Sequence, residues 1–373
     1  MSLAPRSAPR PVLLARQPGW RLASAAAVLV LAAAWIAATQ GAYVVTLADF
    51  FSGAEASAGA QVFWHIRAPR LLMGLVAGAA LGVSGALIQG LFRNPLADPG
   101  LIGVSGGAAL GAALAIVLCG PVTAWLAAGL GQLTGADVAS LPAWPGHGHG
   151  LGPGPWLIMG SAFLGGLMAT LLVWRLARTG GQVHVPLLLL VGVAINALAG
   201  AGLGLMSHLA SDDQLRTITF WLLGSLSGAQ WQTTLACGAV VLAVLVMAPS
   251  QARALNALAL GEAQARLMGV NVPLVQRLCV LWVALAVGAV TALIGMVSFV
   301  GLLAPHAMRL LAGPDHRVVL PGSAVLGAVL VVLADTLART IFSPGELPLG
   351  VLTGLLGAPM FLLMLRRRFT SIH

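Results

Sequence analysis

The sequence predicts an all-α protein that crosses a membrane many times. Hydrophobic residues make up 59% of its 373 residues and charged residues only 8%, whereas roughly a quarter of the residues of a soluble domain are charged. The chain also contains repeated apolar runs of the length that an α-helix needs to cross about 30 Å of hydrocarbon. Together these observations exclude an ordinary soluble domain.

An arginine-containing leader precedes the first apolar run. Residues 1–21 carry four arginines, and an uncharged run then extends from about Leu22 to Val45. We interpret residues 1–21 as a cytoplasmic leader and the run as the first span. A cleaved signal peptide is disfavoured because the run is too long for the apolar region of such a peptide.

Nine further apolar runs bring the predicted number of spans to ten, within one transmembrane domain over residues 22–368. They centre on residues 71–91, 101–119, 156–176, 186–208, 231–248, 273–293, 295–312, 318–340 and 348–365. An even number of spans places both termini on one side of the membrane. With the termini inside, fifteen arginines lie inside and four, namely Arg67, Arg70, Arg216 and Arg339, lie outside. This bias predicts the orientation, because inner loops are enriched in basic residues.

The basic residues also exclude two functions. All nineteen are arginine, so the chain lacks the lysine of a Walker-type phosphate loop and does not hydrolyse ATP by that route. The arginines are spread among loops rather than gathered on one face, which argues against nucleic acid as a partner.

Glycines and histidines mark two further features. Gly74, Gly78 and Gly82 form successive GxxxG steps and predict that another helix approaches this face closely. Residues 120–155 are rich in Gly and Pro and predict an outside loop that includes His147 and His149. Two histidines could bind a metal or haem iron, but a solvated loop is favoured because no third ligand stands at helical spacing. No metal site is predicted, and the three cysteines lack the spacing of ligands or disulfides.

Polar residues within the predicted spans are few. Asn196 lies in the middle of its span, where its amide either bonds a neighbouring helix or lines a transport path. Asp335 stands four residues before Arg339, which predicts an intrahelical ion pair near the outer surface. No other convincing acid lies within a span. This shortage argues against a proton- or sodium-driven carrier, which would need a titratable group at mid-membrane.

Residues 251–271, here called the coupling segment, lie between two apolar runs but are too short and charged to be a span. The sequence from Leu255 to Asn271 predicts a brief amphipathic helix outside the bilayer. Glu262 and Arg266 can pair at a spacing of four, while Ala263, Leu267 and Val270 share one apolar face. That face either rests on lipid headgroups or binds another protein.

Long motifs then make the chain resemble the iron-siderophore, haem and cobalamin permease family of bacterial ABC importers. The motifs are IRAPRLLMGLVAGAALGVSGALIQGLFRNPLADPGLIGVSGGAALG from Ile66, FWLLGSLSG from Phe220, LALGEAQARLMGVNV from Leu258, FVGLLAPHAMRLLAGPDHR from Phe299, and ADTLART with ELPLGVLTGLLGAPMFLLML from Ala334 onward. They cover nearly everything from His65 to Arg368.

The resemblance implies a type II ABC importer permease fold with ten transmembrane helices, in the bacterial inner membrane. It implies a homodimer with the path on its two-fold axis, two cytoplasmic ATPase subunits that hold ATP and Mg, and a periplasmic binding protein. The subunit itself would be no enzyme and would need no cofactor. The motifs resemble those of haem permeases most closely, so haem is the leading cargo, with a ferric siderophore second and cobalamin third.

The resemblance also implies roles for individual residues. Binding-protein docking would fall to Arg67, Arg70 and Arg339. ATPase coupling would fall to Leu258, Leu260, Gly261, Glu262, Ala265, Arg266, Leu267 and Gly269. The spans 186–208 and 348–365 would line the path, with Asn196 and Met206 as the candidate residues. Two other classes remain as alternatives: an ion-coupled secondary carrier, and a structural or receptor membrane protein, which would leave the coupling segment and the outside arginines without roles.

Overall fold

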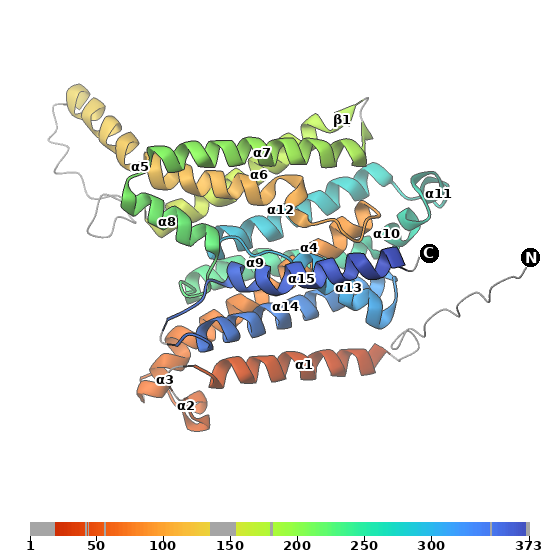
Figure 1. Ribbon diagram of the computed structural model, residues 1–373, viewed down its shortest axis with the longest axis horizontal. Helices are drawn as coiled ribbons and strands as arrows, with labels where there is room; N and C mark the ends of the chain where they lie inside the picture. The colour runs from red at the N-terminus through yellow and green to blue at the C-terminus, as the bar shows by residue number, and fades with distance from the viewer. Residues whose placement is uncertain are drawn as a thin grey trace, which may run out of the picture.

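The computed structural model describes residues 19–41, 43, 45–55, 57–134, 154–179, 182–343 and 345–370, and these residues are almost entirely helical (Figure 1). Two strands of two residues each, β1 (Arg178–Thr179) and β2 (Gln182–Val183), pair antiparallel. The predicted all-α class is confirmed. His147, His149 and residues 1–18 of the predicted leader lie outside the described residues.

Each of the ten predicted spans coincides with an apolar helix. Among the described residues, seven helical stretches are long and apolar enough to cross a membrane, and three shorter apolar helices accompany them, which together make ten. The ten helices are α1 (Gly19–Thr39), α4 (Ala68–Leu91), α5 (Val104–Thr134), α6 (Pro155–Leu176), α7 (Val185–Leu209), α9 (Trp231–Met247), α12 (Val272–Ile294), α13 (Val300–Ala312), α14 (His316–Thr340) and α15 (Leu349–Thr370).

Helix α5 continues beyond the predicted end of its span. The candidate span ends at Pro121, close to the predicted end at residue 119, but the helix continues to Thr134, so residues 120–134 of the expected loop 120–155 are helical. Proline removes one backbone hydrogen bond from a helix. The residues that follow it, VTAWLAAGL, are mostly good helix formers, so the helix resumes.

The helices lie roughly along the long axis of the molecule, which gives the bundle two distinct ends (Figure 1). One end carries α2 (Leu47–Phe51), α3 (Ala58–Gln61) and α8 (Asp212–Leu223), and is called the α3 end below. The opposite end carries α10 (Ala252–Ala259), α11 (Glu262–Leu267) and the β-hairpin, and is called the α11 end. Short turns of 3-10 or π-helix join several elements: η1 (Val62–Arg67), η2 (Pro99–Ile102) and η4 (Ala248–Gln251).

Side-chain hydrogen bonds hold the short helices at the α3 end. The hydroxyl of Ser57 donates to Asp49 at 2.5 Å, and the Thr46 backbone N–H donates to the same carboxylate at 2.8 Å. These bonds hold the pKa of Asp49 below its usual range. Farther along, the Gln214 amide of α8 donates to the backbone carbonyl of Ile116 at 3.1 Å and so fixes α8 against α5.

Helix α4 lies at the centre of the packing and meets α14 along the predicted glycine face. A methyl group at Gly78 would collide with the carbonyl oxygen of Gly327, and one at Gly82 with that of Ser323. Since only glycine leaves room for backbone-to-backbone contact, the two helices interlock over several turns. The predicted close helix approach at this face is confirmed.

Candidate functional site

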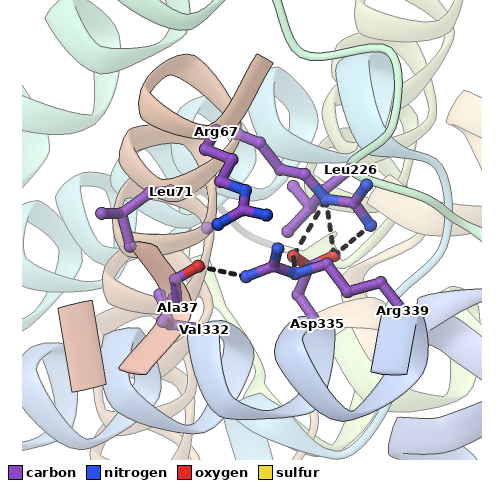
Figure 2. Close-up of a pocket in the computed structure, with 9 residues that line it drawn as sticks. Ala37, Arg67, Leu71, Leu226, Val332, Asp335 and Arg339 are labelled. Carbon is purple, nitrogen blue, oxygen red and sulfur yellow. Dashed lines mark hydrogen bonds and ion pairs between the residues drawn. The ribbon is translucent and has the colours of Figure 1, made fainter. Parts of the chain in front are cut away.

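Three of the four predicted outside arginines gather at the α3 end of the bundle. Arg67 from η1, Arg70 from α4 and Arg339 from α14 line one pocket with Asp335 (Figure 2). Apolar residues complete its wall: Ala37, Leu71, Leu226 and Val332. We call the three arginines together with Asp335 and Glu346 the arginine cluster.

Two carboxylates bind Arg70. Its Nε donates to Asp335 at 3.0 Å, and its Nη2 donates to the same carboxylate at 2.8 Å. Glu346 accepts from Nη1 at 2.8 Å and from Nη2 at 3.1 Å. The predicted pair between Arg339 and Asp335 is also present, with Nε and Oδ2 3.7 Å apart. Asp335 therefore neutralises arginines from two helices at once.

Arg67 and Arg339 bind the end of a third helix, α1. Arg67 donates to the carbonyl oxygens of Ala38 at 2.7 Å and of Tyr43. Arg339 donates to the carbonyl oxygens of Gln40 at 2.8 Å and of Ala37. The last carbonyls of a helix lack intrahelical partners and carry partial negative charge, so cationic side chains stabilise them. The cluster thus joins α1, α4 and α14.

These contacts correct one expectation about the arginines. They lie together at one end of the bundle, but Arg67 is only 6% exposed and Arg70 only 9%, so they are not free surface charges. A guanidinium removed from water needs carboxylates or carbonyls around it, and the hydropathy of the sequence cannot show where these come from. The docking role of the three arginines stays a prediction. The fourth outside arginine, Arg216, is exposed on α8 over the ring of Phe220.

The coupling segment lies at the α11 end and folds as two short helices rather than the single helix that the sequence predicts. Gly261 separates α10 from α11 with a φ of +120°, and Gly269 has a φ of +80°. Residues that carry a side chain rarely adopt these backbone angles, which is why glycine occupies both turns. Glu262 and Arg266 approach to 3.8 Å, so their predicted pairing is confirmed.

The apolar surface of the segment differs from the predicted face. Leu260 is 67% exposed, Leu267 89% and Met268 63%, and we call these three residues the coupling patch. Leu258 and Ala265 are buried and anchor the segment, although both were expected to contact a partner, and Val270 packs against the core instead of lying beside Leu267 on an open face. A projection along one straight helix fails here because Gly261 and Gly269 redirect the chain.

An open cavity of about 510 Å³ lies beside α7. Asn196 lines it and donates to the carbonyl oxygen of Gly100 at 3.0 Å, so its amide bonds a neighbouring element, while its role in a transport path stays a prediction. Other lining residues come from α7, from η2 and its neighbours, and from the turn before α13: Asp98, Ser105, Ala199, Leu203, Met296, Ser298 and Phe299. Burial raises the pKa of Asp98, and the hydrogen bond from the Gly100 N–H opposes this.

Two expectations about the path do not match this cavity. Met206 is buried against Ala113, Ile116 and Ile218 rather than lining the cavity, because it points from α7 toward α5 and α8. Helix α15 contributes none of the lining residues. Phe299 was not predicted as a lining residue. Its φ of 65° is uncommon for a residue with a bulky side chain, and this backbone strain marks the position in the structure.

The described residues contain no group of three or more His, Cys, Asp or Glu side chains that could hold a metal ion. His65 lies 3.7 Å from Glu55 at the surface of the α3 end.

The bundle of apolar helices and the open cavity between them are typical of a membrane permease. The sequence matches the FecCD transport family over residues 27–367. The chain belongs to this family, which confirms the predicted resemblance.

Individual relatives agree with this assignment. The chain is 40% identical over 342 residues, 91% of its length and 94% of the relative's, to the hemin transport system permease protein HmuU of Yersinia pestis. It is 36% identical over 337 residues, 90% of its length and 92% of the relative's, to the vitamin B12 import system permease protein BtuC of Salmonella typhi. A solved structure of an ABC transporter assigned to the metal-chelate type, in an inward-facing conformation, superposes with a TM-score of 0.77 at 28% identity, covering 93% of this chain and 99% of that one.

Proposed function

We propose that this chain is the membrane-spanning permease subunit of an ATP-driven importer that moves haem across the bacterial inner membrane by alternating access. The observation that carries the proposal is the coupling patch. Leu260, Leu267 and Met268 are large, apolar and exposed in one short segment at an end of the bundle, and exposed apolar side chains that gather in this way suit an interaction site. Membership of the FecCD family supports an ATPase as the partner that would cover this patch.

The ATPase would supply the chemistry, and this chain would supply the path. ATP and Mg would bind two ATPase subunits at the α11 end, which faces the cytoplasm in this proposal. The excess of arginines on that side supports the orientation. The permease would need no cofactor of its own and would change no covalent bond, so its work is to convert movement of the ATPases into opening of the path on one side at a time.

A second copy of the chain would complete the path. The cavity beside α7 is open, and α7 exposes Leu190, Leu198 and Leu205 in the same helix that carries Asn196. A homodimer with α7 near its two-fold axis would join two such cavities, and lipid would cover the remaining apolar faces.

The arginine cluster is the proposed docking site for a binding protein at the α3 end. Acidic side chains of that protein would approach the guanidinium groups of Arg67, Arg70 and Arg339, and would compete with the cluster's own carboxylates. Glu346 is the more accessible of these, with 39% of its side chain exposed. Charge pairs of this kind raise the rate of encounter and set the orientation of the complex.

Haem is the proposed cargo because the relative with 40% identity is named as a hemin permease. A ferric siderophore is the second candidate within the same family, and vitamin B12 is the third, since the BtuC relative is 36% identical. A proton- or sodium-driven carrier is disfavoured, since Asp335 in α14 is already bound by two arginines.

ATP-driven uptake into proteoliposomes tests the function. The vesicles would hold this chain with its cognate ATPase and binding protein, and haem, a ferric siderophore and cobalamin would be compared, each with ATP and with a non-hydrolysable analogue. We expect uptake of haem that requires ATP. Uptake of another chelate would replace the cargo, whereas uptake driven by an ion gradient without the ATPase would overturn the class.

A further inference from the structure

Asn256 of α10 binds the beginning of α14. Its Oδ1 accepts a hydrogen bond from the backbone N–H of His316 at 2.9 Å, and the Nδ1 of the same histidine lies 2.9 Å from that oxygen. Its Nδ2 donates to Asp315 at 2.6 Å. Asp315 in turn accepts from the backbone N–H of Arg317 at 2.9 Å and so caps α14. One side chain of the coupling segment therefore holds both the cap and the first residue of α14.

Helix α4 ends at the same point. A methyl group at Gly90 would lie 2.6 Å from Nε2 of His316 and 3.3 Å from Cδ1 of Leu255. Leu255 is fully buried on α10. Gly90, His316 and the coupling segment are thus in close contact, and a side chain at residue 90 would force them apart.

Helix α14, which Asn256 binds, is in close contact with α4 along much of its length. Their backbones touch at Gly78 and Gly327 and again at Gly82 and Ser323, with no side chain between them to allow sliding. At the far end, Arg70 of α4 and Asp335 of α14 are joined by hydrogen bonds of 2.8–3.1 Å. A displacement at the α11 end would therefore reach the arginine cluster at the α3 end.

We propose that Asn256 is a positioning residue that ties the coupling segment to the α4–α14 pair, so that nucleotide-driven movement of the segment changes the arginine cluster and with it the affinity for the binding protein. The inference rests on the proposed function, because it assumes that an ATPase moves the coupling segment. It adds a specific connection: one amide that links the ATPase side to the docking side through two interlocked helices. Linkage requires that binding-protein affinity then depends on nucleotide state, and that the dependence is lost when the connection is cut.

The test measures binding-protein affinity for the assembled complex without nucleotide and with ATP, using a hydrolysis-deficient ATPase. The ratio of the two dissociation constants reports the coupling, and a ratio of about five or more is typical of coupled sites. We expect Asn256→Leu, which keeps the approximate volume but removes the hydrogen bonds, to bring the ratio close to one. Copurification with the ATPase should persist, because the coupling patch is untouched.

Asn271→Ala is the matched control. Asn271 also lies in the coupling segment and also caps a helix, through a hydrogen bond from the Leu274 N–H at 3.2 Å, but that helix is α12. It should keep the ratio of the unaltered complex. Gly90→Ala is a second test variant. Its added methyl group would push α4 away from His316 and Leu255 and should reduce the ratio of dissociation constants although Asn256 is unchanged. This variant tests the inference if the complex with Asn256→Leu does not assemble.

The outcomes separate this inference from the proposed function. A ratio that stays at the unaltered value in both Asn256→Leu and Gly90→Ala, while Leu267→Asp disrupts ATPase association, overturns the inference alone. If Leu267→Asp leaves association, hydrolysis and the ratio unchanged, the coupling role of the whole segment is refuted, and the inference with it.

Discussion

Asp335 is 265 residues away from Arg70 in the sequence, yet its carboxylate accepts three hydrogen bonds from that guanidinium at 2.8–3.1 Å. The pair joins α4 and α14 at the α3 end of the bundle, and the same carboxylate lies 3.7 Å from Arg339. One buried acid thus balances two arginines, and the structure around it depends on that balance.

Replacing Asp335 should destabilise the protein far more than replacing Glu346. Asp335→Asn leaves two arginines short of a buried counter-charge, and breaking such a pair costs about 3–5 kcal/mol. The Glu346 side chain is 39% exposed, and a pair of that kind contributes about 0–1 kcal/mol. Thermal unfolding of the purified protein in detergent compares the two variants. Equal shifts in the unfolding temperature would contradict a buried role for Asp335.

Removing the charge of Arg67 should slow docking of the binding protein. Arg67 binds backbone carbonyls of the α1 region, so Arg67→Gln leaves no carboxylate of the described cluster without its counter-charge. Electrostatic steering can raise association rates by roughly tenfold or more at low salt, and we expect a loss of that order that shrinks as salt increases.

Arg216→Gln is the control for the docking prediction. It removes one charge from the same end, but from an exposed position on α8. Association rates are measured at low and high salt with the binding protein immobilised on a surface. They should change less for this variant than for Arg67→Gln. If both variants slow association equally, the effect is one of net charge and the docking assignment is wrong.

Leu267→Asp should weaken ATPase binding without unfolding the permease. The Leu267 side chain is 89% exposed, so a charge there costs the isolated chain little, whereas burying it at an interface is unfavourable by several kcal/mol. Copurification of the ATPase and the unfolding temperature of the permease are measured together. Thr217→Asp places the same charge on exposed α8 at the opposite end and should leave copurification intact; normal copurification with Leu267→Asp would show that the patch faces solvent or lipid.

The negative charge of Asp315 should stabilise the protein only at pH values above the pKa of this carboxyl group. Hydrogen bonds, first from the Arg317 N–H and then from Asn256, lower the pKa of Asp315 below its ordinary 3.8. A lowered folded-state pKa contributes stability that is fully present above the unfolded-state value and is lost as pH falls through the folded-state value. Asp315→Asn keeps a capping side chain but loses the charge, at a cost of about 0.3–1 kcal/mol at neutral pH.

The pH dependence of unfolding checks this prediction. The unfolding temperatures of the original protein and of Asp315→Asn should differ at pH 7 and converge below about pH 4, near the ordinary pKa of an aspartate. A difference that persists unchanged well below that pH, where the carboxyl is protonated in the folded and the unfolded protein alike, would mean that geometry, and not charge, stabilises the start of α14.

The sequence predicted the residues of the candidate sites better than their surroundings. Arg67, Arg70 and Arg339 do gather at one end, and the segment around Gly261 does expose leucine. Burial of Leu258, Ala265 and Met206 was not foreseen, because each depends on which neighbouring helix covers it. Met268 and Phe299 were missed for the same reason: exposure and backbone strain appear only when the turns are placed.

The sequence by itself determined the ten membrane-crossing helices, the glycine face of α4 and the pairs at a spacing of four residues. These follow from local physics: the length of hydrocarbon to be crossed, the absence of side chains along one face, and the pitch of a helix. Only the tertiary structure decided that Arg70 meets Asp335 and Glu346, that Asn256 holds the start of α14, and where the coupling patch points. Those contacts join residues far apart in the chain, and their partners are selected by how whole helices pack rather than by any local pattern.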